Sequence, residues 1–287
     1  MSTTQAVRKR SRSVAYDDKW RIPEDLWGRI ESLLPPRKPH PLGCHNPRVD
    51  DRKAMDAIFF VLRTGCQWNA LNATGICSSS SAHRRFQEWT AAGVFEQLWK
   101  LGLEEYDMLK GIQWRWQSMD GVMTKSPLGG EKKTGPNPTD RAKCGTKRSL
   151  LCEGAGLPVG LAVGGANRND SKLARETLES IPVPRPRPTR RKRQNLSLDK
   201  GYDHDEVREL AEEFAYTAHI RARGEEAQAI KRKTGFKARR WVVERTHSWM
   251  NRFRRILIRW EKKLENYVGL LHLVCAWITY KTLDLLG

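Results

Sequence analysis

The hydrophobic periodicity of this chain changes near residue 113. Before that point, apolar residues recur at helical spacing, which predicts amphipathic helices separated by Gly, Pro and Ser turns. After it, short apolar runs bounded by glycine predict strands that alternate with helices, so we expect a helical region followed by an α/β region. The predicted elements are helices at 23–34, 51–64, after 78 and at 94–109, strands at 114–123, 148–152 and 157–163, a helix at 170–178, a strand leading to 199, a helix at 205–214, a strand at 216–220, and closing helices around 244 and at 267–285.

The chain is strongly basic. Lysine and arginine number 52 against 33 aspartate and glutamate, which gives a net charge of +19 and a pI near 10.0. Such an excess favours a polyanionic partner, and nucleic acid is the first candidate. A solvated basic surface is the alternative, but the 39% hydrophobic content and 11 tryptophans indicate a folded domain rather than a basic tail. One strongly basic linker, Arg185-Pro-Arg-Pro-Thr-Arg-Arg-Lys-Arg, precedes the strand that leads to residue 199.

Cysteine usage and the apolar runs indicate a compartment. The six cysteines have no zinc-finger spacing, and scattered cysteines are typical of reducing surroundings. The N-terminus lacks the apolar stretch of a signal peptide, and no apolar run approaches the ~18 residues of a membrane span. We therefore expect a cytoplasmic protein that has no membrane partner.

Three acidic residues sit in contexts that suit catalysis. Asp120 and Asp199 fall where predicted strands end, and Glu244 lies near the start of a predicted long helix. Buried carboxylates are costly unless they are paired or bind a cation, so three of them in a basic chain suggest a metal site that faces a polyanion. Asp140 and Asp170 are weaker alternatives, because one lies in a Pro/Gly-rich loop and the other fits a helix cap.

The helix around Glu244 is predicted to be amphipathic. On a helical wheel, several polar residues fall within about 60° of Glu244, while apolar residues between 242 and 257 lie opposite. A solvated salt-bridge face is the ordinary explanation for such a pattern. The polar set is better suited to contacting phosphates or bases, and it comprises Arg240, His247, Ser248, Asn251 and Arg255.

A helix after Ser78 has features of a DNA-reading element. Ser78 is a suitable N-cap, and the opposite face of the helix carries His83, Arg84, Arg85 and Gln87. A turn near Gly93 and a further helix complete an arrangement like a helix–turn–helix. A plain helical bundle with exposed arginines is the alternative. The expected organisation is a disordered basic tail (1–18), a helical DNA-binding domain (19–110) and a catalytic domain (111–287).

Several sequence blocks resemble bacterial insertion-sequence DDE transposases of the insertion-sequence-five superfamily. They occur in the family's order across about residues 22–285. The blocks are Leu62-Arg-Thr-Gly-Cys-Gln-Trp, Arg84-Arg-Phe-Gln-Glu-Trp, Met119-Asp-Gly, Gly135-Pro-Asn-Pro-Thr-Asp-Arg, Gly145-Thr-Lys-Arg, Ala166-Asn-Arg-Asn-Asp, Asp199-Lys-Gly-Tyr-Asp and the run from Arg240 to Arg255.

The resemblance implies a fold and a metal centre. It implies an RNase H-like mixed sheet flanked by helices, preceded by an all-α, helix–turn–helix-like region. Asp120, Asp199 and Glu244 would bind two Mg²⁺ or Mn²⁺ ions, which activate the attacking and leaving oxygens of a phosphodiester. The family signature also places Arg four residues before the Glu, as Arg240 is here. Its usual Tyr and Lys positions are instead Lys237 and Asn251, a departure that leaves the three acidic residues intact.

The resemblance also implies partners. We expect a bacterial transposase, nucleoid-associated when DNA-bound, that cuts at insertion-sequence ends and joins the 3′-OH ends to target DNA, acting as a homodimer or higher oligomer. A catalytically inactive DNA-binding relative and a metal-dependent nuclease without strand transfer stay open as alternatives. The predicted DNA contacts are Arg84, Arg85, Lys143, Lys147, Arg148, Lys200, Arg240, His247, Ser248, Asn251, Arg252 and Arg255.

Overall fold

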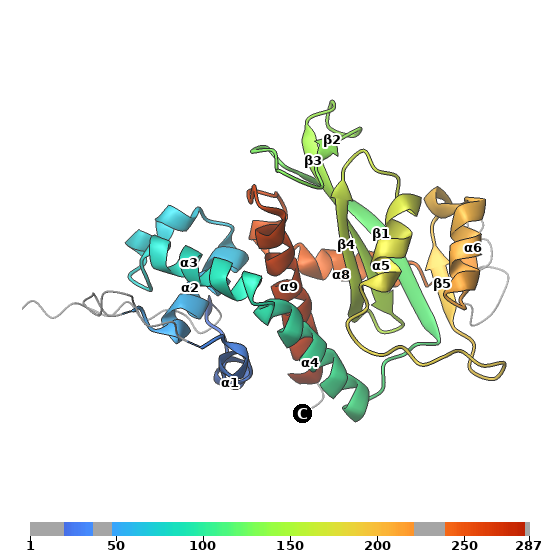
Figure 1. Ribbon diagram of the computed structural model, residues 1–287, viewed down its shortest axis with the longest axis horizontal. Coiled ribbons are helices and arrows are strands. Elements are labelled where there is room, and N and C mark those ends of the chain that lie inside the picture. Colours follow the sequence, from blue (N-terminus) through green and yellow to red (C-terminus); the bar gives the residue numbers. More distant parts are fainter. Residues whose placement is uncertain (1–19, 37–47, 221–238, 285–287) are drawn as a thin grey trace, which may run out of the picture.

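The computed structural model of the 287-residue chain describes residues 20–36, 48–220 and 239–284 (Figure 1). The predicted basic tail, most of the Pro-rich loop before residue 48, and Lys237 lie outside these described residues. No helix among the described residues is long and apolar enough to cross a membrane.

The first half of the chain is helical, as the periodicity predicts. Its caps follow the sequence: the Asp50 side chain accepts from the Lys53 N–H at 3.0 Å, and Ser78 caps the later helix through the Ser81 N–H. Gly65 ends its helix with a left-handed φ of 72°, a conformation that glycine adopts without strain. The elements are α1 (Glu24–Leu33), α2 (Asp51–Thr64), the 3-10 helix η2 (Trp68–Ala73), α3 (Ser79–Ala91) and α4 (Val94–Leu109).

The second half forms a mixed sheet in the order β4-β3-β1-β5-β6, with β2 added beside β3. The β1–β3 and β3–β4 pairs are antiparallel, whereas β5 and β6 run parallel to β1. This is the predicted RNase H-like arrangement. The sequence prediction missed β2 and began β3 four residues too late. The strands are β1 (Trp116–Lys125), β2 (Gly135–Pro136), β3 (Cys144–Glu153), β4 (Pro158–Gly165), β5 (Asn195–Leu198) and β6 (Thr217–Ile220).

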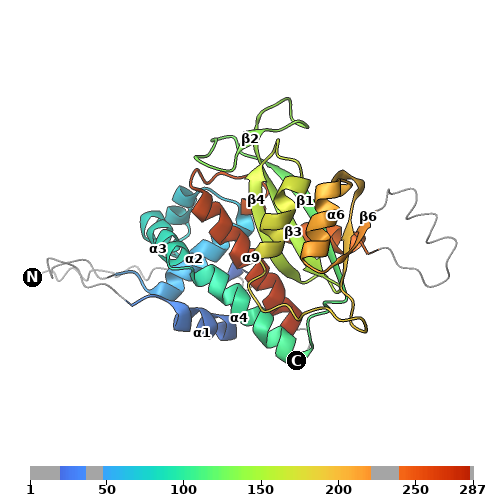
Figure 2. The same ribbon diagram turned by 45° about the vertical axis from the view of Figure 1, so that its right-hand side comes forward.

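Helices cover both faces of the sheet (Figures 1 and 2). On β3, the side chains of Lys147 and Ser149 reach the α5 segment, and Arg148 between them reaches Asn251 after α8. Because side chains alternate along a strand, α5 and α8 lie on opposite faces. The remaining elements are α5 (Ser171–Glu179), the 3-10 helix η3 (Lys200–Tyr202), α6 (Asp205–Glu213), α8 (Trp241–Met250), the 3-10 helix η4 (Arg254–Ile256) and α9 (Leu264–Asp284).

One hydrophobic core runs through both halves of the molecule. Buried side chains from α1 to α4 belong to the same cluster as those of the sheet and α9. Helix α4 packs along α9, and the Trp99 indole N–H donates to the Pro158 carbonyl at 3.1 Å. The helical region is therefore fastened to the sheet through α9. The domain division at residue 110 stays a prediction.

Candidate active site

The strand register brings Asp120 and Asp199 together. Strands β1 and β5 are parallel, and Ser118 pairs with Ser197. Two residues further along each strand stand Asp120 and Asp199, so the two aspartates occupy matching positions where β5 ends. Asp199 also caps η3, because its Oδ1 accepts from the Gly201 N–H at 2.9 Å.

The surroundings of Asp120 disfavour its negative charge. Burial, together with the neighbouring carboxylates of Asp199 and Asp170, raises the pKa of the Asp120 carboxyl to about 6. The Gly121 N–H, which donates to Oδ1 at 2.9 Å, and the Arg240 guanidinium act in the opposite direction. A divalent cation would offset the repulsion between the Asp120 and Asp199 carboxylates, whose oxygens are the hard ligands that Mg²⁺ and Mn²⁺ prefer.

Glu244 comes to the same face of the sheet on α8. The Ser118 hydroxyl, on the Asp120 side of β1, donates to the Arg239 carbonyl at 2.8 Å and holds the start of this helix. Oε1 of Glu244 lies 3.1 Å from Nη1 of Arg240, and the Glu244 side chain is 42% exposed. Among the described residues, no three His, Cys, Asp or Glu side chains are gathered closely enough to enclose a metal ion. Glu244 therefore forms an ion pair with Arg240 rather than a cage with the two aspartates.

His247 is part of the interior rather than of the polar surface. Its Nε2 lies 3.3 Å from the Asp120 carbonyl oxygen, and only 4% of the residue is exposed. Burial lowers the pKa of its imidazole to about 3, with the Arg148 charge adding to this effect. The ring is thus neutral at physiological pH, which suits a role in fastening α8 to β1.

The two alternative acids occupy different places. Asp140 pairs with Lys125 at 3.2 Å in the loop before β3. Asp170 pairs with Lys147 at 3.0 Å and lies against Gly121, where a Cβ atom would be only 2.0 Å from its Oδ1. Gly121 is paired with Ser149, whose side chain faces α5, so Asp170 approaches β1 from the face opposite Asp120.

Several predicted DNA contacts are buried inside the protein. Three of them are buried and form ion pairs within the protein: Arg85 pairs with Glu88, Lys147 with Asp170, and Arg255 with Glu261. Arg148 is 1% exposed and donates to the Asn251 side chain. The prediction of direct DNA contact therefore does not fit Arg85, Lys147, Arg148, His247 or Arg255. Arg240 is 9% exposed and bound to Glu244. The predicted contacts that do lie at the surface are Arg84, Lys143, Lys200, Ser248, Asn251 and Arg252.

The error on α8 has a local cause. The helical wheel assumed one continuous helix through residue 255, but α8 ends at Met250 and the chain turns into η4. Beyond that turn the wheel no longer describes which way side chains point. On α3, the His83 ring packs against Trp68, with 4.8 Å between the ring centroids.

Comparison with known proteins agrees with this architecture. The profile of the transposase DDE domain matches residues 117–279, and one described as "Putative transposase of IS4/5 family" matches residues 22–99. A Burkholderia cepacia protein, described as a "Putative transposase for insertion sequence element IS402", is 37% identical over 160 residues, which cover 54% of this chain and 72% of that protein. The chain therefore belongs to the DDE transposases of the IS4/5 family, which are metal-dependent enzymes that cut and join DNA.

Two further proteins are similar over part of the chain. An uncharacterised 16.2 kDa protein of the same IS402 element is 36% identical over 115 residues, covering 39% of this chain and 77% of that protein. Among solved structures, the catalytic domain of Mos1 mariner transposase covers 64% of this chain and 88% of its own, at 13% identity and a TM-score of 0.28.

Proposed function

We propose that Asp120, Asp199 and Glu244 form the metal-binding triad with which this DNA transposase cuts its element ends. The observation that carries the proposal is the register of β1 and β5, which sets Asp120 and Asp199 side by side. The raised pKa of Asp120 supports it, since a site that gathers carboxylates in partly buried surroundings is suited to a divalent cation. The helical region 19–110 would bind DNA, and the region 111–287 would carry the chemistry.

Each residue of the proposed site would have a role set by its position. Asp120 and Asp199 would hold the cations, and Glu244 would complete the site by exchanging its ion pair with Arg240 for a metal contact. Two bound Mg²⁺ or Mn²⁺ ions would supply activation of the attacking oxygen and stabilisation of the leaving one. Arg240, released from Glu244, would stay beside the site as a positive charge for a phosphate group. His247 would act as a positioning residue that keeps α8 against β1.

The substrates would be double-stranded element ends and then target DNA. Water would attack first, and the exposed 3′-OH would attack the target phosphodiester second, so no covalent protein intermediate is needed. Bringing two ends together implies a homodimer or higher oligomer on DNA. A nuclease without strand transfer shares the first step, so the joined product distinguishes the two activities.

The test compares Asp199→Asn with Asp203→Asn on duplexes that carry the element ends, in Mg²⁺ and in Mn²⁺. Asparagine keeps the side-chain oxygen that caps η3 but removes the charge, so Asp199→Asn should lower strand cleavage by at least about 10³-fold, equivalent to about 4 kcal/mol. Asp203 pairs with Arg208 at the surface, and its variant should cleave like the parent. Cleavage by Asp199→Asn at the parental rate would refute the triad, and cleavage without joined strands would favour the nuclease.

A further inference from the structure

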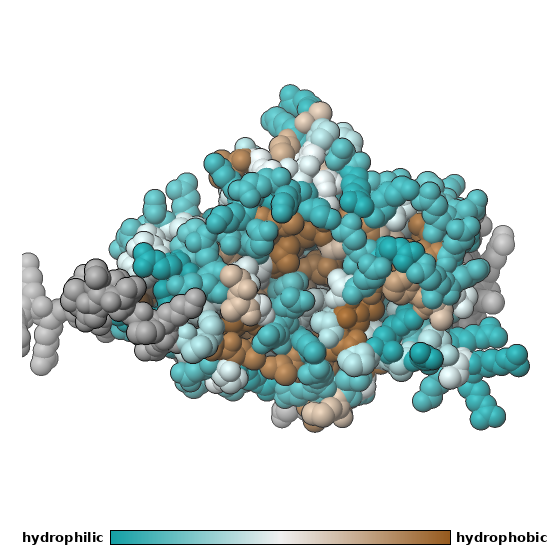
Figure 3. Space-filling view, in the orientation of Figure 1, coloured by the Kyte–Doolittle hydropathy of each residue, from teal (hydrophilic) through white to brown (hydrophobic). Residues whose placement is uncertain are grey.

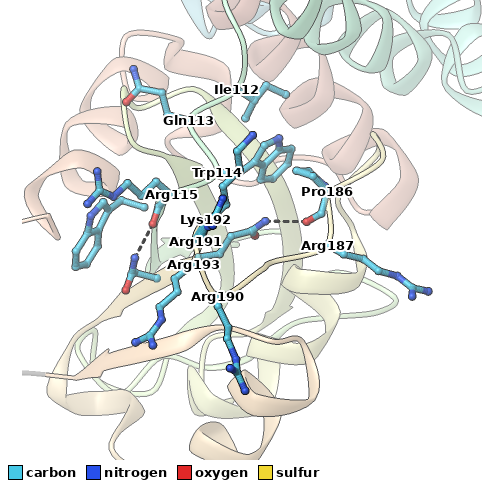
Figure 4. A pocket seen from close by; sticks show the side chains of 13 residues that line it. Ile112, Gln113, Trp114, Arg115, Pro186, Arg187, Arg190, Arg191, Lys192 and Arg193 are labelled. Carbon is cyan, nitrogen blue, oxygen red and sulfur yellow. Dashed lines mark hydrogen bonds between the residues drawn. The ribbon is translucent and has the colours of Figure 1, made fainter.

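A basic groove opens at the end of the sheet where β1 and β5 begin (Figure 4). It has a volume of about 920 Å³ and lies between the segment 112–116 and the α5–β5 connection, residues 186–195. The aspartates lie further along the same strands. The groove is therefore separate from the candidate active site, and none of the predicted DNA contacts lines it.

The cations of this groove face outwards. Arg187, Arg190, Arg191, Lys192 and Arg193 are all exposed, and Arg115 adds a sixth positive charge from the other wall. None of the six forms an ion pair with an acidic side chain among the described residues. In Figure 3, hydrophilic side chains project at the lower right of the molecule, where Figure 1 shows the α5–β5 connection. Holding so many like charges together disfavours the folded state, so an anionic partner is expected to offset them.

The connection that carries these charges is fastened at both ends. The Gln194 side chain donates to the Pro186 carbonyl at 2.8 Å, and the Asn195 side chain donates to the Arg115 carbonyl at 2.8 Å. Between them, a turn is closed by the Lys192 N–H, which donates to the Thr189 hydroxyl at 3.0 Å. The groove is therefore formed before any ligand binds, and its cations lose less freedom on binding than those of a loose tail would.

The lining also offers polar groups without internal partners. Among the described residues, the Trp114 indole N–H and the side-chain carbonyl of Gln194 make no hydrogen bond, although Trp114 is 8% and Gln194 4% exposed. Buried polar groups are normally paired, so these two atoms are exceptions in the wall of the groove, although each is itself covered by neighbouring protein atoms.

An aromatic and basic track connects the groove to the aspartates. Trp116, Ser118 and Asp120 lie on one face of β1, and the rise of a strand puts Trp116 about 13 Å from Asp120. The Arg239 guanidinium lies 5.4 Å from the centroid of the Trp116 ring, and the centroid of the His219 ring lies 4.8 Å from it. A duplex with a phosphate at Asp120 would thus need only about four base-pair steps to reach the groove, at the ~3.4 Å repeat of B-DNA.

We propose that this groove binds the sugar–phosphate backbone of duplex DNA a few base pairs from the scissile phosphate. The proposal rests on the proposed function and adds a binding surface to it. Because the cations sit on an irregular connection rather than on an element that could enter a groove of DNA, they should contact phosphates and not read bases. Element-end and target DNA share this chemistry, and binding assays with both distinguish the two sources.

The test uses the full chain with Arg190, Arg191 and Arg193 changed together to Gln. Affinity is measured for two labelled duplexes, one with and one without the element end, from about 50 to 200 mM salt. Loss of three phosphate contacts should reduce the slope of log affinity against log salt by about 2.7, three times the ~0.9 of each contact. If the groove variant loses affinity for both duplexes, the groove binds DNA backbone in general. If it loses affinity for only one duplex, the groove is assigned to that DNA.

A matched triple variant controls for net charge. Lys172, Arg175 and Arg208 are exposed cations of α5 and α6 that do not line the groove, and each pairs with an acid. Changing all three to Gln removes the same charge but should leave the slope within about 1 of the parental value. If the groove variant kept the parental slope, or if both variants lost equally, the groove proposal would be wrong.

Cleavage separates this proposal from the proposed function. The parent should cut element-end duplexes, and the control triple variant, whose residues lie outside the groove and the candidate active site, should cut them within about threefold of the parental rate. If the parent cuts DNA and the groove variant binds DNA as tightly as the parent does, the groove proposal is wrong and the proposed function stands. A parent that neither binds nor cuts overturns the proposed function, and the groove proposal with it.

Discussion

Arginine and lysine serve opposite purposes in two regions of this molecule. Around β3 and η4, Lys147, Arg148, Arg255 and Arg259 are almost wholly buried and are held by internal partners. In the α5–β5 connection, residues 187–193, the cations are exposed and have no acidic partner among the described residues. The net charge of +19 therefore combines a structural set with a set available to DNA.

The difference follows from the cost of burying charge. An ion removed from water must recover its solvation energy from a partner, so a buried cation becomes part of the protein's architecture. An exposed cation keeps its hydration and can exchange counterions for phosphates. The number of basic residues in a segment thus says less about DNA binding than their exposure does. The same measurement, the free energy of unfolding, can test this contrast in both regions.

The largest loss in the free energy of unfolding is expected from Arg255→Ala. Arg255 pairs with the 5% exposed Glu261 through Nε and Nη2 at 2.8 and 2.7 Å, and also donates to the Cys66 carbonyl. Removing it leaves a buried carboxylate without its cation, which should cost about 3–5 kcal/mol in chemical denaturation. The double variant Arg255→Met with Glu261→Met should recover most of this loss, because no charge is then stranded. A cost below about 1 kcal/mol for the single variant would contradict a structural role.

The next largest loss in the free energy of unfolding is expected from Lys147→Ala, for which Lys172→Ala is the matched surface control. The Lys147–Asp170 pair spans 3.0 Å with the lysine side chain 7% exposed, whereas the shorter Lys172–Glu206 pair, at 2.6 Å, is mostly in solvent. Burial outweighs the length of the contact, so Lys147→Ala should lower the free energy of unfolding by about 1–3 kcal/mol and Lys172→Ala by less than about 0.5 kcal/mol. Equal losses in urea titrations would mean that burial does not decide the strength of these pairs.

The same contrast explains what could be read from the sequence. Periodicity and caps located most of the helices and strands, because patterns such as Ser78 at a helix start are local, but they extended the helix of Glu244 past its end at Met250. The strand contexts of Asp120 and Asp199 were also visible locally. Burial depends on which segments meet in space, so the sequence could not show that Arg148 lies under α8. The sequence analysis also interpreted the basic segment before β5 as a linker. Five cations within residues 187–193 were the signal that could have indicated an anion-binding surface.

The groove variant, with Arg190, Arg191 and Arg193 changed to Gln, should have the smallest effect on the free energy of unfolding and the largest effect on DNA binding. Arg190, Arg191 and Arg193 make no ion pair among the described residues, so changing all three to Gln removes mutual repulsion as well as minor contacts. The free energy of unfolding should stay within about 0.5 kcal/mol of the parental value, or rise slightly at low salt. A loss above about 2 kcal/mol would place these arginines with the buried set, and the reduced salt dependence of DNA binding would then reflect unfolding rather than lost phosphate contacts. Denaturation at low and high salt resolves this, because only relief of charge repulsion fades as salt is added.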